Sequence, residues 1–443
     1  MGRFVNALVV MLAAFAWLGT RYIRTFGSLA GRPNEFGTIG IFATELLAIE
    51  IAVLAAAAFW RRRAVFRRRE VAAALALAAL ALVSVAWSPD RHYAFLSVAR
   101  LALGAGVMIA MIIFQPRKDA VLGALLGGAA VNALLGFGQV LMQRADSSLW
   151  FGIAAHRPSD LGTFVVETAS GRWLRAYGAV AHPNILGLLC VVGILAACGL
   201  ALAADSEKKR AVLFGVTVLL AAGLTVAFSR GAFLSLIFGA IAMIAILRSA
   251  KTPRSNMSPL YRSLAAVALV TALFAGIYHE AFLTRVEAVG RLETRSISER
   301  LRSFDDARRL IIKNPVTGVG IGQMPLAVLN LVGPDPSPSR FQAAHDEGLL
   351  VTAELGILGL ILWLFIRVRL IQTLFISIKR GGEDKFLNAA VFGIIIALLT
   401  SGLVDHFLWD SWFGQLLFWL TAGLAFSESI AISGKKAPQI GNS

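Results

Sequence analysis

Long runs of hydrophobic residues, separated by short polar stretches, repeat along the whole 443-residue chain. A membrane-spanning helix needs about 20 mainly apolar residues, so each run predicts one such helix. The predicted spans cover residues 4–19, 39–60, 71–87, 93–114, 120–142, 182–203, 211–228, 231–248, 262–279, 347–366, 386–404 and 411–426. The expected fold class is therefore all-α, a polytopic membrane protein with about twelve transmembrane helices in a single integral-membrane domain, residues 1–443.

The first run also has features of a signal peptide, because Arg3 precedes an apolar stretch of suitable length. No clear cleavage motif of small residues separates this run from the next segment of the chain, and keeping it gives an even number of spans. We therefore predict an uncleaved first span. The two cysteines, Cys190 and Cys198, lie eight residues apart in one apolar run and are predicted to be small core residues without a disulfide.

The composition agrees with the pattern, because 57% of the residues are hydrophobic and only 15% are charged. Soluble domains carry roughly 25% charged residues, and disordered chains need low hydrophobicity, so both classes are excluded. The net charge of +16 would indicate nucleic acid in a soluble protein. In a membrane protein, the excess of Lys and Arg on cytoplasmic loops can account for much of this charge, and we predict no nucleic-acid partner.

Placing the N-terminus in the cytoplasm internalises 23 of the 42 basic residues, among them those of segments 61–69 and 367–385 and of the tail, Lys435 and Lys436. Both termini are therefore predicted to be cytoplasmic. The inner set holds eight lysines, whereas the outer set holds 18 arginines and one lysine, Lys313. Because arginine binds phosphate bidentately, this asymmetry indicates a phosphate-bearing ligand on the outer side. The alternative explanation for the excess of arginine is a GC-rich genome that favours arginine codons, although such a bias should act on both sides of the membrane alike.

The longest predicted connection, residues 280–346, is an outer loop inserted between spans 9 and 10. Loops of this length are usually functional. Residues 296–313 predict an amphipathic helix in it, with capping-box spacing between Ser296 and Glu299 and a stop at Asn314–Pro315.

Helical periodicity divides this predicted helix into two faces. The apolar stripe, which carries Arg308 and has Arg300 at its edge, comprises Ile297, Leu301, Phe304 and Ile311. The opposite, solvated face comprises Glu299, Arg302, Asp306 and Arg309. For Arg308, snorkelling to lipid phosphates is the simpler alternative to ligand binding.

Further polar groups fall at the outer ends of predicted spans. Arg230 lies between two apolar runs, where an arginine is costly unless it is paired or hydrated, so its default interpretation is functional. His345 precedes the tenth span and has the chemistry of a general base. His182 and the pair Asp405–His406 also lie at the outer ends of spans. They could assist a functional site, or they could simply anchor the helices at the membrane–water interface. Glu354 is expected to pair with an arginine, and the glycine-rich turn at residues 316–322 could form an anion-binding nest.

Several of these residues together resemble the bacterial O-antigen ligase and O-antigen polymerase superfamily. The motifs are Ser229-Arg230-Gly231-Ala232, Arg300 on the loop helix, Ala181-His182-Pro183-Asn184, the Pro315–Gly322 turn, and His345-Asp346 followed after nine residues by Gly356-Ile357-Leu358-Gly359. The resemblance covers roughly residues 175–426. It departs at Asp346, where the ligases usually have Asn, Ser or Gln.

The resemblance implies an inverting membrane glycosyltransferase of the bacterial inner membrane, with its active site and long loop on the periplasmic side. Such enzymes move a glycan from undecaprenyl pyrophosphate to an acceptor sugar hydroxyl, here of lipid A–core, without a metal or other cofactor. The implied catalytic residues are His345, which activates the acceptor, and Arg230 and Arg300, which hold the pyrophosphate. Arg175, Arg308 and His182 are implied substrate contacts, and membrane lipids are further partners.

Three alternatives stay open. An O-antigen or exopolysaccharide polymerase uses the same donor and differs in its acceptor, and a protein O-glycosyltransferase is a more distant relative. A twelve-span transporter is an alternative of another class, but transporters place polar residues near the bilayer midplane, whereas here they gather at the outer edge.

Overall fold

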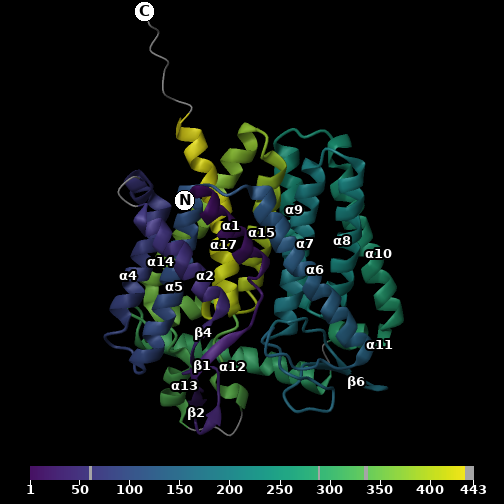
Figure 1. Ribbon diagram of the computed structural model, residues 1–443. Helices are drawn as coiled ribbons and strands as arrows, with labels where there is room; N and C mark the ends of the chain where they lie inside the picture. The colour runs from purple at the N-terminus through teal and green to yellow at the C-terminus, as the bar shows by residue number, and fades with distance from the viewer. Residues whose placement is uncertain (59–61, 288–289, 334–337, 435–443) are drawn as a thin grey trace, which may run out of the picture.

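Roughly parallel helices form a bundle, and shorter elements cover one end of it (Figure 1). The computed structural model describes residues 1–58, 62–287, 290–333 and 338–434, with side chains described through Ser427. Arg61, Lys435 and Lys436 therefore lie outside the described residues, as do positions 288–289 and 334–337 of the long predicted loop. The bundle helices are α1 (Gly2–Ala14), α2 (Ala43–Ala57), α4 (Arg69–Ser84), α5 (Arg91–Phe114), α6 (Lys118–Met142), α7 (Pro183–Ala203), α8 (Glu207–Val226), α9 (Arg230–Ser249), α10 (Ser258–Ile277), α14 (Glu347–Arg380), α15 (Lys385–Gly402) and α17 (Trp412–Gly434).

Every predicted apolar run corresponds to one of these helices, which confirms the all-α polytopic fold class. Within the described ranges, eight helices are long and apolar enough to cross a membrane: α5 to α10, α14 and α15. Helices α1, α2 and α4 have 13, 15 and 16 residues, and the described side chains of α17 end at Ser427. The total of twelve spans therefore stays a prediction.

Helix α7 is the centre of the bundle, and nearly all of its residues are buried. Small residues let its neighbours approach closely, which is how helices pack where lipid gives no hydrophobic driving force. A Cβ on Gly193 would lie 2.8 Å from Ala129 of α6, and one on Gly199 would lie 2.4 Å from Ala390 of α15. Both cysteines of α7 are free and buried, as the sequence predicts.

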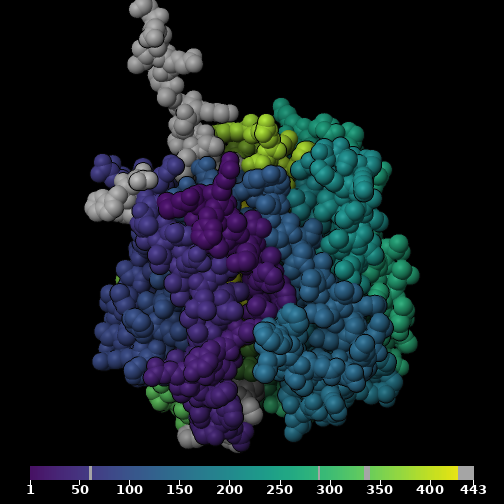
Figure 2. Space-filling model, in the orientation of Figure 1, coloured from purple at the N-terminus to yellow at the C-terminus, as the bar shows by residue number. Residues whose placement is uncertain are grey.

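Three two-stranded sheets lie at one end of the bundle, and the hydrophobic pattern did not reveal them. Strands β1 (Arg21–Thr25) and β4 (Ile39–Phe42) pair antiparallel, as do β2 (Ser28–Leu29) with β3 (Arg32–Pro33) and β5 (Val165–Thr168) with β6 (Gly171–Leu174). The segment after α1 contacts the one after α6, because the Thr20 hydroxyl donates to the Trp150 carbonyl at 2.5 Å. Figure 2 shows these two segments, purple and blue, side by side over this end.

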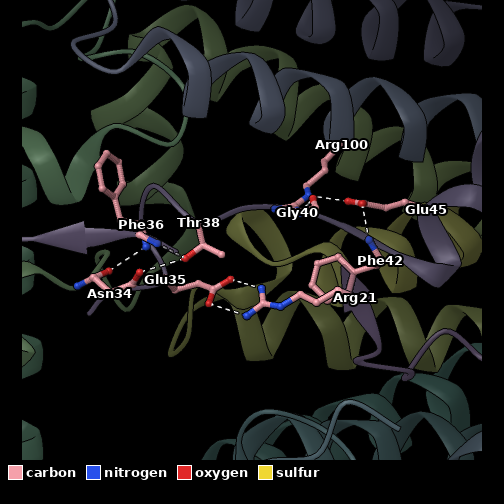
Figure 3. Close-up of polar contacts among 10 residues, drawn as sticks. Arg21, Asn34, Glu35, Phe36, Thr38, Gly40, Phe42, Glu45 and Arg100 are labelled. Carbon is pink, nitrogen blue, oxygen red and sulfur yellow. Dashed lines mark hydrogen bonds and ion pairs between the residues drawn. The ribbon is translucent and has the colours of Figure 1, made fainter. Parts of the chain in front are cut away.

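Arg100 is a charged residue within the apolar run of α5, and its guanidinium finds hydrogen-bond partners at the junction of α2 and this covering layer (Figure 3). Its Nε donates to Glu45 at 2.6 Å, and its Nη2 donates to the Gly40 carbonyl at 3.3 Å. Glu45 also accepts from the Phe42 backbone N–H at 2.8 Å, which caps α2. Arg21 forms a bidentate pair with Glu35 in the same layer. These bonds fix the covering segment to the bundle.

The region between α10 and α14 completes this end. It contains α11 (His279–Glu287), α12 (Arg291–Lys313), α13 (Met324–Val332) and the 3-10 helix η3 (Pro338–Phe341). Helix α12 runs across the ends of the bundle helices, whereas α1 begins at the opposite end, where α17 also finishes (Figure 1). The lysine-bearing loops lie at that opposite end too, because Lys379 and Lys385 bond to the carbonyls of Ser249 and Ala250.

Candidate functional site

Helix α14 reverses direction at Gly356, which has φ 66° and ψ −168°. The Arg367 guanidinium and the Trp363 indole both donate to the same carboxylate oxygen of Glu347. Residues 20 positions apart on a straight helix would be separated by about 30 Å. The first part of α14, residues 347–355, must therefore run back beside the second part, residues 357–380. The predicted single span 347–366 is wrong in this respect, because the chain enters the bundle and turns out again.

This reversal also corrects the predicted cytoplasmic position of Arg367. The residue is buried within α14, with its guanidinium 3.6 Å from the centre of the Trp363 ring. It is neutralised by Glu347, as an intramembrane charge requires. Since residues 347–355 return from inside the bundle, the preceding residue pair His345–Asp346 lies recessed from the bundle end.

The glycine-rich turn docks on this break. The N–H groups of Val319 and Gly320 donate to the carbonyls of Ala353 and Glu354, both at 2.9 Å, and Ile357 donates to the Pro315 carbonyl. A Cβ on Gly356 would lie 2.0 Å from the Val316 oxygen, so only glycine fits here. Two amides of the turn thus bind the carbonyls that the broken helix releases, and the Gly322 amide bonds to the Glu354 carboxylate, so the acidic group that this turn holds is a side chain of the protein itself.

His345 lies against the loop after α15. Its Nδ1 is buried and has no hydrogen-bond partner within the described part of the chain. Its ring lies edge-to-face against His406, with ring centroids 5.0 Å apart. Burial lowers the pKa of His345 to about 4, with His406 and Arg300 acting in the same direction and Asp405 against it. The imidazole is therefore neutral near pH 7 and can accept a proton.

His406 has the opposite protonation state. Burial alone would lower its pKa, but Asp410, 2.7 Å from its Nδ1, and Asp405 raise it to about 9. Burial would raise the pKa of Asp405, yet three neighbouring histidines lower it overall. The neutral imidazole of His345 therefore lies beside the charged imidazole of His406, whose charge is stabilised by the carboxylates of Asp405 and Asp410.

Asn184 connects this histidine cluster to Arg175. Its side-chain nitrogen donates to Asp405 at 3.1 Å, and its oxygen accepts from Arg175 at 2.8 Å. Arg175 is buried and also donates to the Ala227 carbonyl at 3.0 Å. Burial, and then repulsion from Arg175, lower the pKa of His182 to about 3. Both His182 and Arg175 therefore belong to the group that surrounds Asp405.

Arg230 lies in a second group, with Arg285 and Glu293. It donates to the Arg285 carbonyl at 3.0 Å and to the Glu293 carboxylate at 2.8 Å, and Arg285 pairs with the same carboxylate. Burial lowers the pKa of Arg285, Glu293 opposes this shift, and Arg230 and Arg300 add to it. Two guanidinium groups thus share one buried counter-ion.

Arg300 lies between the two groups, since its charge acts on both Arg285 and His345. It is half-buried, and its guanidinium has no hydrogen bond or ion pair to any described residue. Arg308 is on a different side of α12, where it is largely exposed and paired with Asp305 at 3.3 Å. The structure therefore brings Arg300 to the site residues and does not bring Arg308 there.

Helix α12 differs from its prediction in two ways. It begins at Arg291, so Ser296 is inside the helix and the predicted capping box is wrong. It packs through Ser303, Asp306, Ala307 and Leu310, while Leu301 is 62% exposed. Asp306, expected in solvent, is buried because Arg340 pairs with it. The predicted stop at Asn314 is confirmed.

Sequence reasoning missed Arg285, Glu293 and Asp410, and it gave no preference to His406. The residues between Arg285 and Glu293 have no regular apolar pattern, so nothing in the sequence indicated that these two belong to a site. Asp410 stands four residues after His406, the i,i+4 spacing of an ion pair, and this signal was available. Glu354 pairs with the Trp409 indole at 2.8 Å and not with an arginine, which corrects that expectation.

Taken together, four arginines and the charged His406 surround the carboxylates of Glu293, Asp405 and Asp410, so positive charge exceeds negative. Such a surface favours an anion with several oxygens. The described residues include no group of three or more His, Cys, Asp or Glu placed to hold a metal ion. The arrangement can therefore bind a phosphate-bearing ligand next to a neutral imidazole.

The fold and this site define a multi-pass, all-α membrane protein with a cationic site at one end of its helix bundle. The family model described as O-antigen ligase matches residues 215–364, about a third of the chain, which include Arg230, Arg300 and His345. This match confirms the predicted resemblance to the O-antigen ligase superfamily, whose members are membrane glycosyltransferase-like ligases and polymerases. Arg175, His182 and the Asp405–Asp410 segment lie outside the matched residues. No curated protein matches the sequence.

Proposed function

We propose that the protein is an inverting glycosyltransferase that moves a glycan from undecaprenyl pyrophosphate to a sugar hydroxyl of lipid A–core. The observation that carries the proposal is the proximity of two groups that have no polar partner among the described residues, the guanidinium of Arg300 and the buried Nδ1 of His345. One suits the donor's pyrophosphate and the other suits an acceptor hydroxyl.

In the proposed reaction, the acceptor oxygen attacks the anomeric carbon while its proton passes to His345. The bond between the anomeric carbon and the phosphate oxygen breaks, and its electron pair goes to the pyrophosphate. Arg300 and Arg230 stabilise the negative charge that develops there, which is electrostatic catalysis of the leaving group. The anionic donor would also offset the cations near His345, which raises its proton affinity when the donor is bound.

We further propose that this site faces the periplasm and that the membrane is the bacterial inner membrane. The loops with Lys208, Lys209, Lys251, Lys379 and Lys385 occur at the bundle end opposite α12. Cytoplasmic loops carry the excess of basic residues, so this end is assigned to the cytoplasm together with both termini.

The direct test is to incubate the purified protein with an undecaprenyl-pyrophosphate-linked glycan and lipid A–core, and to identify the product by mass spectrometry. We expect transfer to lipid A–core in wild type and none in His345→Ala or Arg300→Ala. Arg308→Ala is the matched control, because it removes the same charge from the same helix at an exposed position. Elongation of the donor glycan without transfer to lipid A–core would assign the protein to the polymerases instead. Equal loss in the Arg300 and Arg308 variants would contradict the proposed site.

A further inference from the structure

A cavity of about 700 Å³ lies at the bundle end opposite the candidate site. It is formed by the last turn of α7, the first turns of α8 and α10, the 3-10 helix η2 (Ser255–Met257) and Phe386 of α15. Ligand-binding cavities have volumes of roughly 300–1,000 Å³, so the space suits a small ligand or a lipid headgroup.

Arg210 on α8 contributes the first cation to the lining of this cavity. Its Nη1 pairs with Glu207 and its Nη2 donates to the Ala204 carbonyl at 2.8 Å. Its Nε is buried and has no hydrogen-bond partner among the residues the structure describes. Glu207 is the one acidic residue among the described residues of the lining, and Arg210 already pairs with it.

The α10 side of the cavity adds hydrogen-bond donors and no acidic side chain. Arg262 is exposed, and nothing in the described ranges forms an ion pair or hydrogen bond with its side chain. Ser255 and Ser258 line the cavity at the start of α10, the positive end of a 20-residue helix. The lining therefore carries one uncompensated cation, Arg262, a second arginine that pairs with Glu207, and the hydroxyls of three serines, a set that matches a phosphate group.

Most of the remaining lining is apolar, and it continues onto the outside of the bundle. Phe214 and Leu202 form part of the cavity, and Phe214 is 42% exposed. Beyond the cavity, α8 exposes Val212, and α10 exposes Leu269 and Leu273. A ligand with a phosphate at one end and hydrocarbon at the other satisfies both surfaces. Basic pockets between transmembrane helices are a known kind of lipid-headgroup site.

We propose that this cavity binds the phosphate of an anionic phospholipid, whose acyl chains lie along the exposed faces of α8 and α10. The neighbouring Lys208, Lys209 and Lys251 place the site at the basic end of the bundle, in the leaflet opposite to the glycan-transfer site. The inference is independent of the proposed reaction, because none of these residues belongs to that site.

Native mass spectrometry of the full-length protein in mild detergent, titrated with phosphatidylglycerol or phosphatidylcholine, tests this proposal. We expect one phosphatidylglycerol to bind at least about tenfold more tightly than phosphatidylcholine. Arg262→Ala should weaken phosphatidylglycerol binding by about tenfold, the effect of losing one charged hydrogen bond. Arg254→Ala is the matched control, because Arg254 is an exposed arginine next to η2 that does not line the cavity.

Arg210→Gln provides a second variant, which removes the other cation of the lining and should weaken phosphatidylglycerol binding further when combined with Arg262→Ala. Unchanged affinity in both single variants, or equal affinity for the two lipids, would overturn the proposal. Soluble glycerol phosphate is the third probe. If it binds as tightly as phosphatidylglycerol and shows the same dependence on Arg262, the ligand is a free phosphate compound and the lipid assignment fails.

Discussion

His345 and His406 lie edge-to-face with ring centroids 5.0 Å apart, yet they are in opposite protonation states near pH 7. Burial lowers the pKa of His345 to about 4, whereas Asp410 and Asp405 outweigh the effect of burial at His406 and raise its pKa to about 9. Protonated His345 cannot accept a proton, and neutral His406 no longer contributes positive charge. In the proposed reaction, the pair would therefore set two limits on activity, one acidic and one alkaline.

We expect kcat/KM for glycan transfer to be level between about pH 5.5 and 8, because this ratio reports the groups of the free enzyme. It should fall as pH drops through about 4 and as pH rises through about 9. His182 and Arg300 also face this pair, and the pKa of His182, about 3, lies below that interval. Asp410→Asn removes the main group that raises the pKa of His406, so it should move the alkaline limb to lower pH and leave the acid limb in place. An acid limb centred near 6.5, the ordinary histidine value, would contradict the buried position of His345.

Arg230→Lys should reduce kcat/KM by about 100-fold or more, nearly as much as Arg230→Ala. The two Nη atoms of Arg230 make different bonds, one to the Arg285 carbonyl and one to Glu293. A single ammonium cannot reproduce this planar pair of bonds while also presenting a donor to the pyrophosphate. Arg144→Lys, at an exposed ion pair with Asp146, is the control and should have wild-type kinetics. Steady-state transfer assays on purified variants measure both, and activity retained in Arg230→Lys would show that charge alone suffices.

Gly356→Ala should prevent the reversal of α14. Alanine is strained at φ 66°, and its Cβ would lie 2.0 Å from the Val316 carbonyl oxygen, a backbone atom that cannot move aside. We expect a loss on the order of 3 kcal/mol or more in the free energy of unfolding. Thermal unfolding followed by fluorescence-detected size exclusion measures this loss as a lower transition temperature.

Gly276→Ala in α10 is the matched control for this substitution, because a Cβ there meets no atom within 4 Å. It should leave the transition temperature unchanged or raise it slightly. Similar behaviour of the two alanine variants would show that the break in α14 does not depend on glycine.

The sequence predicted helix positions better than it predicted contacts. Apolar run length is set by the bilayer, so the helix boundaries agree within about four residues except at α1, α14 and α17. The reversal at Gly356 was not predictable from hydropathy, because an apolar run continues across it without a polar break. Asp306 was assigned to solvent because its burial depends on Arg340, 34 residues away. Arg300 and His345 were identified from motifs, but Glu293, which orients Arg230, has no local pattern to mark it.

Removing one partner of the buried Glu347–Arg367 pair should be more harmful than removing both. Each single variant, Glu347→Leu or Arg367→Met, leaves a charge without a counter-ion in the bundle and should cost about 3–5 kcal/mol. The double variant replaces the pair with apolar side chains and should recover most of that loss. Transition temperatures of the three variants form a double-mutant cycle, and additive losses would show that the two side chains do not interact.

Cysteine labelling tests which end of the bundle faces the periplasm. The native cysteines, Cys190 and Cys198, are fully buried, so they should give little background with a membrane-impermeant maleimide. Ser159→Cys places an exposed thiol at the bundle end that holds the candidate site, and Glu383→Cys places one in the exposed loop between α14 and α15. In intact spheroplasts we expect labelling of Ser159→Cys alone, and labelling of Glu383→Cys only after lysis, because basic loops stay in the cytoplasm. The reverse result would put Arg230, Arg300 and His345 on the cytoplasmic side, out of reach of a periplasmic acceptor.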